Sequence, residues 1–243
     1  GGQTPLNLAA DLKKYGVNMH VHVSETKQEH EECKARHGGR TPAQLLCDLG
    51  AFDTRTTAAH CVWAEEEDIE IFSEKGVTVV TCPVSNLKLA SGVCNVPALM
   101  KKGVNVAIGT DSVASNNSLN FIEEMKFFAL LNKERRNDPT LITPKETLRA
   151  AARAGALSQG REDCGVLAVG RKADLTVLDI GQPHMRPVHN LANNIVYSAS
   201  GSDVVLTMAD GRVLYRDGDF LTIDVEKAAA ETERACRDIL RQL

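Results

Sequence analysis

The sequence is poor in aromatic residues and carries no excess of positive charge. Of its 243 residues only 4% are Phe, Trp or Tyr, and the net charge is -4. A basic surface with interleaved aromatic side chains is therefore not expected, which argues against nucleic acid as a partner. No run approaches the roughly 18 consecutive apolar residues that a membrane-spanning helix needs, so we expect no membrane partner either. The hydrophobic fraction of 43% is ample for a core.

Cysteine pairs at the spacing of metal or redox motifs are also missing. The seven cysteines are odd in number, irregular in spacing, and include no Cys-x-x-Cys pair. Reduced thiols in a reducing, cytoplasmic environment fit this distribution better than a disulfide framework does. Cys61, Cys82 and Cys94 lack the neighbours that mark a nucleophile, so we expect buried, inert thiols. Because the sequence opens on Gly1-Gly2 rather than on Met, the lack of a signal peptide says little, and we expect the natural start to lie elsewhere.

What the sequence does contain is a repeated unit in which a short apolar strand stops at a polar residue and a helical pattern follows. The polar tips of successive parallel strands gather at one end of a sheet, as on the catalytic face of a barrel. The strands are expected at 17–25, 56–60, 77–81 and 104–111, and helices at 5–16 (beginning at Thr4-Pro5), 26–37, 42–50, 64–75, 97–102, 119–136 and 144–160.

The pattern changes near residue 165. Turn-rich sequence leads to strands at 175–178, 204–208 and 212–215, the last two joined by the Asp210-Gly211 turn. An amphipathic helix is expected over the final segment. We therefore divide the chain into an α/β part at 1–164, a small β part at 165–224 and a C-terminal helix at 225–243.

Four polar residues at or just past the strand ends are candidates for chemistry. Imidazole and carboxylate groups are ligands that zinc and iron accept, and His22 and Asp111 are the best placed for that role. Glu25, three residues after His22, lies where a carboxyl group can shuttle protons to a substrate. His60 can orient an attacking water molecule, and Asp111 can also accept a proton from it. Such a set suits hydrolysis at an electron-poor ring carbon.

Other polar residues receive a structural interpretation. His20 lies on the same face of its strand as His22, one layer deeper, and is expected to support the site from the barrel interior. His30 and His37 belong to a charged helix and its exit, and are expected to be solvated. The acidic run at 65–68 is expected to begin a helix rather than to bind a cation.

Several of these stretches together resemble the amidohydrolase superfamily. The similarity is greatest to the branch of the 5'-methylthioadenosine/S-adenosylhomocysteine deaminases and triazine chlorohydrolases. The motifs that carry it are His22-Val-Ser-Glu25-Thr26, His60-Cys61, and the runs at 82–92, 109–117, 170–175 and 183–190.

The resemblance implies an α/β fold: the C-terminal half of a metal-dependent (β/α)8 TIM barrel, with strands 5 to 8, followed by the C-terminal part of a small β-sandwich. It implies one divalent metal, zinc first and iron or manganese as alternatives. The implied roles are metal binding for His22 and Asp111, catalysis for Glu25, His60 and Asp111, and substrate binding for Glu25, Ser85, Asn86 and Asp111.

The implied activity is hydrolytic deamination of the adenine ring in nucleosides of the methylthioadenosine and S-adenosylhomocysteine type, in an enzyme that is a homo-oligomer at full length. Family members carry a His-x-His metal motif on strand 1, which is missing here. His20-Val21-His22 does not replace it, because the Ser-Glu-Thr that follows belongs to strand 5. We therefore expect the C-terminal portion of a longer enzyme, possessing activity only with the missing half.

Two alternatives remain open. One is another ring amidohydrolase, such as a guanine or cytosine deaminase or a triazine-type chlorohydrolase. The other is a catalytically silent fragment that acts as an assembly partner. A zinc deaminase of the cytidine type is excluded, because its His-x-Glu and Pro-Cys-x-x-Cys signature is absent.

Overall fold

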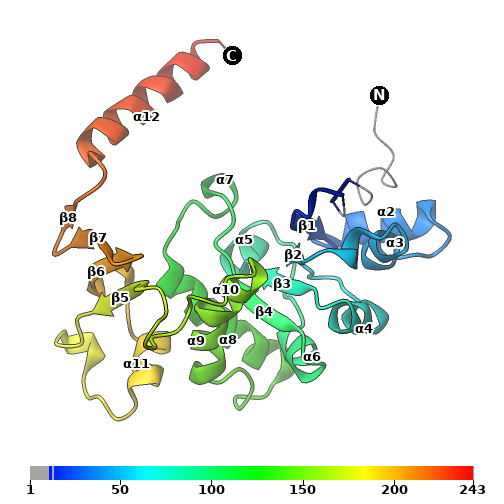
Figure 1. The fold of residues 1–243 in the computed structure, drawn as a ribbon, viewed down its shortest axis with the longest axis horizontal. Helices are drawn as coiled ribbons and strands as arrows, with labels where there is room; N and C mark the ends of the chain where they lie inside the picture. The colour runs from blue at the N-terminus through cyan, green and yellow to red at the C-terminus, as the bar shows by residue number, and fades with distance from the viewer. Residues whose placement is uncertain (1–10, 13, 243) are drawn as a thin grey trace.

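The computed structural model describes residues 11, 12 and 14–242, and it contains two separate sheets with helices packed around the first (Figure 1). The helix expected to begin at Thr4 starts outside the described residues. Among the described residues, no helix is both long enough and apolar enough to cross a membrane.

The first sheet is parallel and follows the order of the sequence. Its strands are β1 (Met19–Val23), β2 (Thr56–His60), β3 (Thr78–Thr81) and β4 (Asn105–Ile108), each paired with the next. The four predicted strands are therefore present, and their carboxyl ends lie at one edge.

Helices follow and connect these strands. They are α2 (Lys27–Arg36), α3 (Pro42–Asp48), α4 (Glu66–Glu74), α5 (Pro83–Lys88), α6 (Val96–Lys101), α7 (Val113–Asn116), α8 (Phe121–Arg136), α9 (Pro144–Ala151) and α10 (Arg153–Ser158), with a 3₁₀ turn at η1 (Ala51–Asp53).

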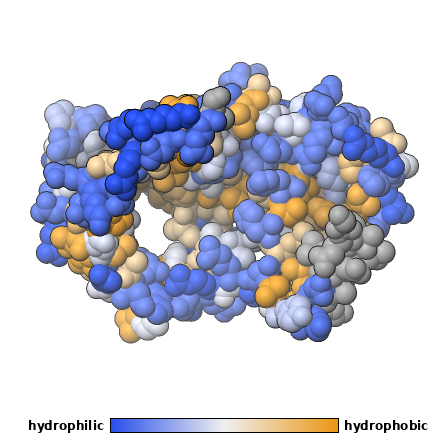
Figure 2. All heavy atoms as spheres, turned by 90° about the horizontal axis from the view of Figure 1, so that it is seen from above, coloured by the Kyte–Doolittle hydropathy of each residue, from blue (hydrophilic) through white to orange (hydrophobic). Residues whose placement is uncertain are grey.

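One face of this sheet packs against helices and the other is open in β1. Met19 and Val23 of β1 are buried in the core, whereas His20 and His22, which alternate with them, are exposed. The expectation that His20 lies in an enclosed interior is therefore not met in this chain. The space-filling view from above shows a hollowed surface in which apolar residues lie among hydrophilic ones (Figure 2).

The predicted helix starts follow from their capping residues. Thr41 begins α3 and Thr143 begins α9, each with its side chain accepting an N–H bond and with proline next in sequence. The acidic run at 65–68 begins α4, as expected. The helix expected at 144–160 is interrupted at Ala152, whose φ of -116° and ψ of -75° separate α9 from α10.

The second sheet is antiparallel. It contains β5 (Leu175–Leu178), β6 (Val204–Ala209), β7 (Arg212–Arg216) and β8 (Asp219–Phe220) in that order. Asp210 and Gly211 both have positive φ, 50° and 78°, as a two-residue hairpin requires. Helix α11 (Leu191–Tyr197), strand β8 and the 3₁₀ turns η2 (Pro183–Met185) and η3 (Gly201–Asp203) were not expected. Helix α12 (Val225–Leu240) buries none of its residues and extends away from both sheets (Figure 1).

Candidate active site

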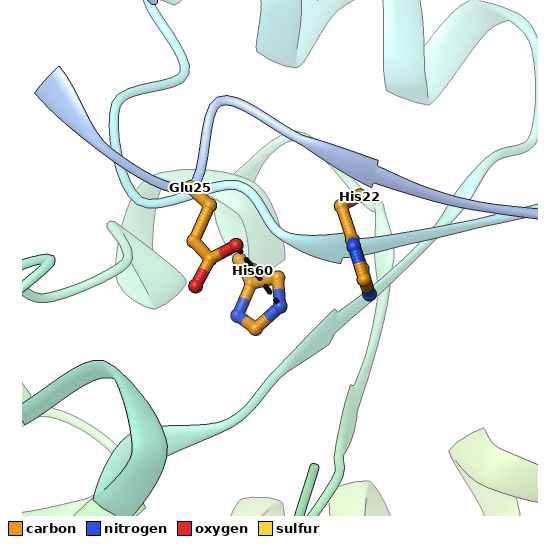
Figure 3. Close-up of side chains that lie close together, drawn as sticks. All are labelled: His22, Glu25 and His60. Carbon is orange, nitrogen blue, oxygen red and sulfur yellow. Dashed lines mark ion pairs between the residues drawn. The ribbon is translucent and has the colours of Figure 1, made fainter. Parts of the chain in front are cut away.

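Three of the predicted residues converge at the carboxyl ends of β1 and β2. His22 comes from β1, Glu25 from the loop that follows it, and His60 from the end of β2 (Figure 3). Their nitrogen and oxygen ligand atoms all lie within 4.8 Å of one another. The rings of His22 and His60 meet edge to face at 5.1 Å between centroids, and Nε2 of His60 lies 3.8 Å from Oε2 of Glu25. This arrangement is the centre of the candidate site.

The backbone at these strand ends adopts an uncommon conformation. Ser24, His60 and Asp111 have φ values of 49°, 68° and 62°. The left-handed region costs a residue other than glycine about 1–2 kcal/mol. Such strain persists only where surrounding contacts enforce it, and it concentrates at functional sites. Positive φ also occurs in ordinary turns of this chain, at Ile142 and Asp210, so at the ends of β1, β2 and β4 it describes how the loops turn and does not by itself mark a functional site.

The protonation of His60 follows from its partner. Nδ1 lies 2.8 Å from Oδ1 of Asn86, an amide oxygen that can only accept, so Nδ1 carries the hydrogen. In the neutral ring Nε2 is then an acceptor, and it faces the Glu25 carboxylate. Two acceptors face each other favourably only with a cation or a proton between them. A divalent ion of the zinc type, or a water molecule bound to it, would meet that condition, and the His22 imidazole beside the pair is a donor that zinc accepts.

Asp111 is held beside this group. Ser85 donates through Oγ to Asp111 Oδ2 at 2.6 Å, and the Ser112 N–H donates to Oδ1 at 2.6 Å. Burial raises the pKa of Asp111, but these hydrogen bonds and the nearby His60 outweigh it and hold the pKa below its ordinary value. Asp111 is thus ionised at neutral pH. It lies outside the three-residue cluster, so its pairing with His22 as a metal ligand stays a prediction.

All six predicted site residues lie at one edge of the parallel sheet. Helix α5 connects the cluster of His22, Glu25 and His60 to Asp111. Asn86 links His60 to α5, and Ser85 links the same helix to Asp111. Both α5 residues are buried. These hydrogen bonds connect Ser85 and Asn86 to His60 and Asp111, and their role in substrate binding stays a prediction.

The burial of two polar residues near the site was not predicted from the sequence. His30 is 2% exposed and contacts Ser24 and Glu65, so the interpretation that it is solvated is wrong. Helix α2 has no apolar stripe that could have revealed its buried side. His37 is exposed, as expected.

Glu124 of α8 is the second buried polar residue. It accepts hydrogen bonds from the Val84 N–H at 3.1 Å and from Asn116 Nδ2 at 2.5 Å. Its spacing with the apolar residues of α8 was a usable signal.

The thiols near the site are buried, as the sequence predicts. Burial raises the pKa of Cys82 to about 12, with the charge of Asp111 the next contribution. Burial likewise raises the pKa of Cys94 to about 12, and that of Cys61 well above its usual value. Thiols so rarely ionised are poor nucleophiles. All seven cysteines are free.

A model described as the amidohydrolase family matches residues 6–214. Among curated proteins, the 5-methylthioadenosine/S-adenosylhomocysteine deaminase of Caldanaerobacter subterraneus is 43% identical over 242 residues, covering 99% of this chain and 56% of that protein. The 5'-deoxyadenosine deaminase of Methanosarcina mazei is 40% identical over 228 residues, covering 94% of this chain and 52% of that protein. The chain thus spans about half the length of the curated relatives it matches.

Solved structures show the same fold. An adenosine deaminase from Xanthomonas campestris with bound zinc superposes with a TM-score of 0.93 at 34% identity, covering 98% of this chain and 54% of that one. The atrazine chlorohydrolase of Arthrobacter aurescens, complexed with zinc, superposes with a TM-score of 0.86 at 26% identity, covering 95% of this chain and 51% of that one.

Proposed function

Because this chain belongs to the amidohydrolase family, we propose that it carries part of the active site of a metal-dependent deaminase of adenine nucleosides. The observation that carries the proposal is the convergence of His22, Glu25 and His60 at the carboxyl ends of parallel strands. Similarity to curated relatives named for methylthioadenosine, S-adenosylhomocysteine and 5'-deoxyadenosine supports thioether and deoxy nucleosides as the substrate class.

His22 would hold the metal, with Asp111 as a second ligand. A divalent ion, zinc first and iron or manganese as alternatives, would polarise a water molecule there and lower its pKa. Similarity to neighbours with bound zinc supports that choice.

The remaining residues handle the water, the protons and the substrate. His60, with Nδ1 held by Asn86, accepts a hydrogen bond from the water through Nε2. Asp111, held by Ser85, takes the proton as the water adds to the ring carbon that bears the amino group. Glu25 gives its proton to the adjacent ring nitrogen. As the carbon–nitrogen bond breaks, Asp111 passes its proton to the amino group, which leaves as ammonia, and the new hydroxyl group returns a proton to Glu25 and becomes the ring carbonyl. Ser85 and Asn86 border the position of the bound ring.

Turnover requires more chain than is present here. Among the residues that the structure describes, strands β1 and β4 each have one unpaired edge, and the face of β1 that bears His20 and His22 is exposed. Parallel sheets in natural proteins almost always have both faces covered, and their open edges are protected or covered. We infer that the region 1–164 is the C-terminal half of a (β/α)8 barrel, that 165–224 is part of a β-sandwich, and that 225–243 is an appended helix.

The N-terminal half of such an enzyme would cover the exposed face of β1 and the free sheet edges. The completed enzyme would assemble as a homo-oligomer. The free thiols favour the cytoplasm as its location.

Substrate class is tested by assaying two samples. One is the chain alone, and the other is the chain co-expressed with the amino-terminal segment of the Caldanaerobacter relative, which we call the completed protein. We expect the completed protein to release ammonia from methylthioadenosine, S-adenosylhomocysteine and 5'-deoxyadenosine about 100-fold faster than from guanine or cytosine, because pockets built to hydrogen-bond a substrate reject others strongly. The chain alone is expected to be inactive.

Faster reaction of guanine or cytosine, or chloride release from a chlorotriazine, would contradict the nucleoside assignment in favour of the other ring hydrolases. No turnover of any substrate by the completed protein would favour a catalytically silent assembly partner.

A further inference from the structure

We propose that His30 is a positioning residue: it holds the turn after β1 so that Glu25 faces His60. The inference rests on the proposed function for the role of Glu25, but the geometry of the turn stands independently of it. His30 is the residue that α2 buries, and its ring joins the turn to the start of the next β-α unit.

The hydrogen bonds of His30 fix its tautomer. Nε2 lies 3.0 Å from Oε1 of Glu65, and a carboxylate only accepts, so Nε2 carries the hydrogen. Nδ1, 3.1 Å from Oγ of Ser24, is then the acceptor of the Ser24 hydroxyl in the neutral ring. The direction of both bonds is thereby set, running from Ser24 through the imidazole to Glu65.

Glu65 is a firm anchor for the ring. Lys34 donates to the same Oε1 at 2.6 Å, and the Glu65 N–H donates to Asp68 Oδ2 at 2.9 Å, at the start of α4. The hydrogen bond from Lys34, followed by that from His30, holds the pKa of Glu65 below its ordinary value. The carboxylate therefore stays charged at neutral pH and keeps the Nε2 hydrogen directed toward it.

Ser24 is the point at which the chain turns. It is fully buried, its φ is 49°, and its carbonyl oxygen accepts the Trp63 N–H at 3.0 Å. The next residue, Glu25, donates its own N–H to Glu29 Oε2 at 2.7 Å. Without the bond to His30, Ser24 is free to relax to the extended region that serine prefers, which would turn the Glu25 side chain away from His60.

The order serine, histidine, glutamate is also that of a nucleophilic triad, but here it cannot act as one. The nucleophile of such a triad must reach the substrate, and Ser24 has no exposed surface. The backbone of Ser24 is also held, because its carbonyl oxygen accepts a hydrogen bond from the Trp63 N–H. The three residues therefore hold the backbone of the catalytic loop in place.

Two substitutions at position 30 separate the two hydrogen bonds. His30→Asn places an amide oxygen near the position of Nδ1 and can keep the Ser24 bond while losing Glu65. His30→Gln places an amide N–H near the position of Nε2 and can keep Glu65 while losing Ser24. Both replace the ring by a smaller polar group, so each controls for loss of packing in the other.

The first readout is amide hydrogen exchange in the 243-residue chain. The Trp63 N–H bonds to Ser24, whereas the Cys61 N–H bonds to Val23, one residue earlier, and serves as the internal control. We expect Trp63 to exchange about tenfold faster in His30→Gln, as the loss of one hydrogen bond implies, with Cys61 unchanged. Exchange of Trp63 is expected to be unchanged in His30→Asn.

Unchanged Trp63 exchange in both variants would overturn the inference. Equal acceleration of Trp63 and Cys61 would also overturn it, since that result indicates general destabilisation.

The second readout is turnover by the completed protein. We expect kcat to fall in His30→Gln while KM stays unchanged, and kcat of His30→Asn to stay near the wild-type value. Normal kcat in His30→Gln would overturn the positioning role. If the wild-type protein releases no ammonia, the proposed function fails, while the exchange pattern still decides whether His30 holds the turn.

Discussion

Glu25→Gln is expected to lower kcat of the completed enzyme by about 10²- to 10⁴-fold, the usual contribution of a general acid or base. The amide has the size and shape of the carboxyl group, so the turn at Ser24 and its hydrogen bonds remain. It cannot give up a proton to a ring nitrogen, however, and it carries no charge opposite Nε2 of His60, 3.8 Å away. The measurement is ammonia release under single-turnover conditions, together with a thermal melt.

Glu31→Gln supplies the matched control. Glu31 is an exposed carboxylate on α2, outside the cluster of ligand atoms, and its substitution should leave kcat unchanged. Near-normal turnover in Glu25→Gln would remove Glu25 from the mechanism. A large fall of kcat in both variants would indicate that turnover depends on the total negative charge around α2 and not on proton transfer by Glu25.

Phe128→Ala is expected to lower the free energy of unfolding of the chain by about 3–5 kcal/mol, the range for removing a large buried aromatic side chain. Phe128 is 1% exposed and belongs to the core, with Met125 one turn earlier on the same face of α8. Phe128 already lines a small pocket together with Pro83 and Asn86 of α5, so the new cavity would adjoin the helix that holds Ser85 and Asn86. Urea unfolding followed by circular dichroism measures the change.

Leu130→Ala is the control on the same helix. Leu130 is 41% exposed, and its truncation should change the free energy of unfolding by less than about 1 kcal/mol. Equal destabilisation by the two substitutions would contradict the packing of α8 described here.

The elements were predictable where local chemistry decides them. Runs of apolar and β-branched residues that stop at a polar group gave the four parallel strands, and a threonine followed by proline marked the starts of α3 and α9. The break at Ala152 carries no such mark, because an alanine-rich sequence favours a continuous helix. Helix α11 begins at an Asn cap after a proline-rich stretch and was also missed.

The site was predictable as single residues and less so as a network. His22, Glu25 and His60 could be placed at strand ends, and the structure brings them together. The bond between His60 and Asn86 joins residues 26 positions apart, which no local pattern encodes. His30 was misinterpreted for the same reason, since its buried surroundings come from the turn after β1 and from Glu65, 35 positions away.

Zinc stoichiometry tests the candidate site most directly. After incubation with zinc and gel filtration, the completed protein should hold about one zinc per assembled enzyme, and His22→Ala should lose most of it, because the substitution removes one of the imidazole ligands assigned to the ion. His37→Ala, which removes an exposed histidine outside the site, should retain the metal. Equal zinc content in the wild type and in His22→Ala would contradict a metal centre at the end of β1.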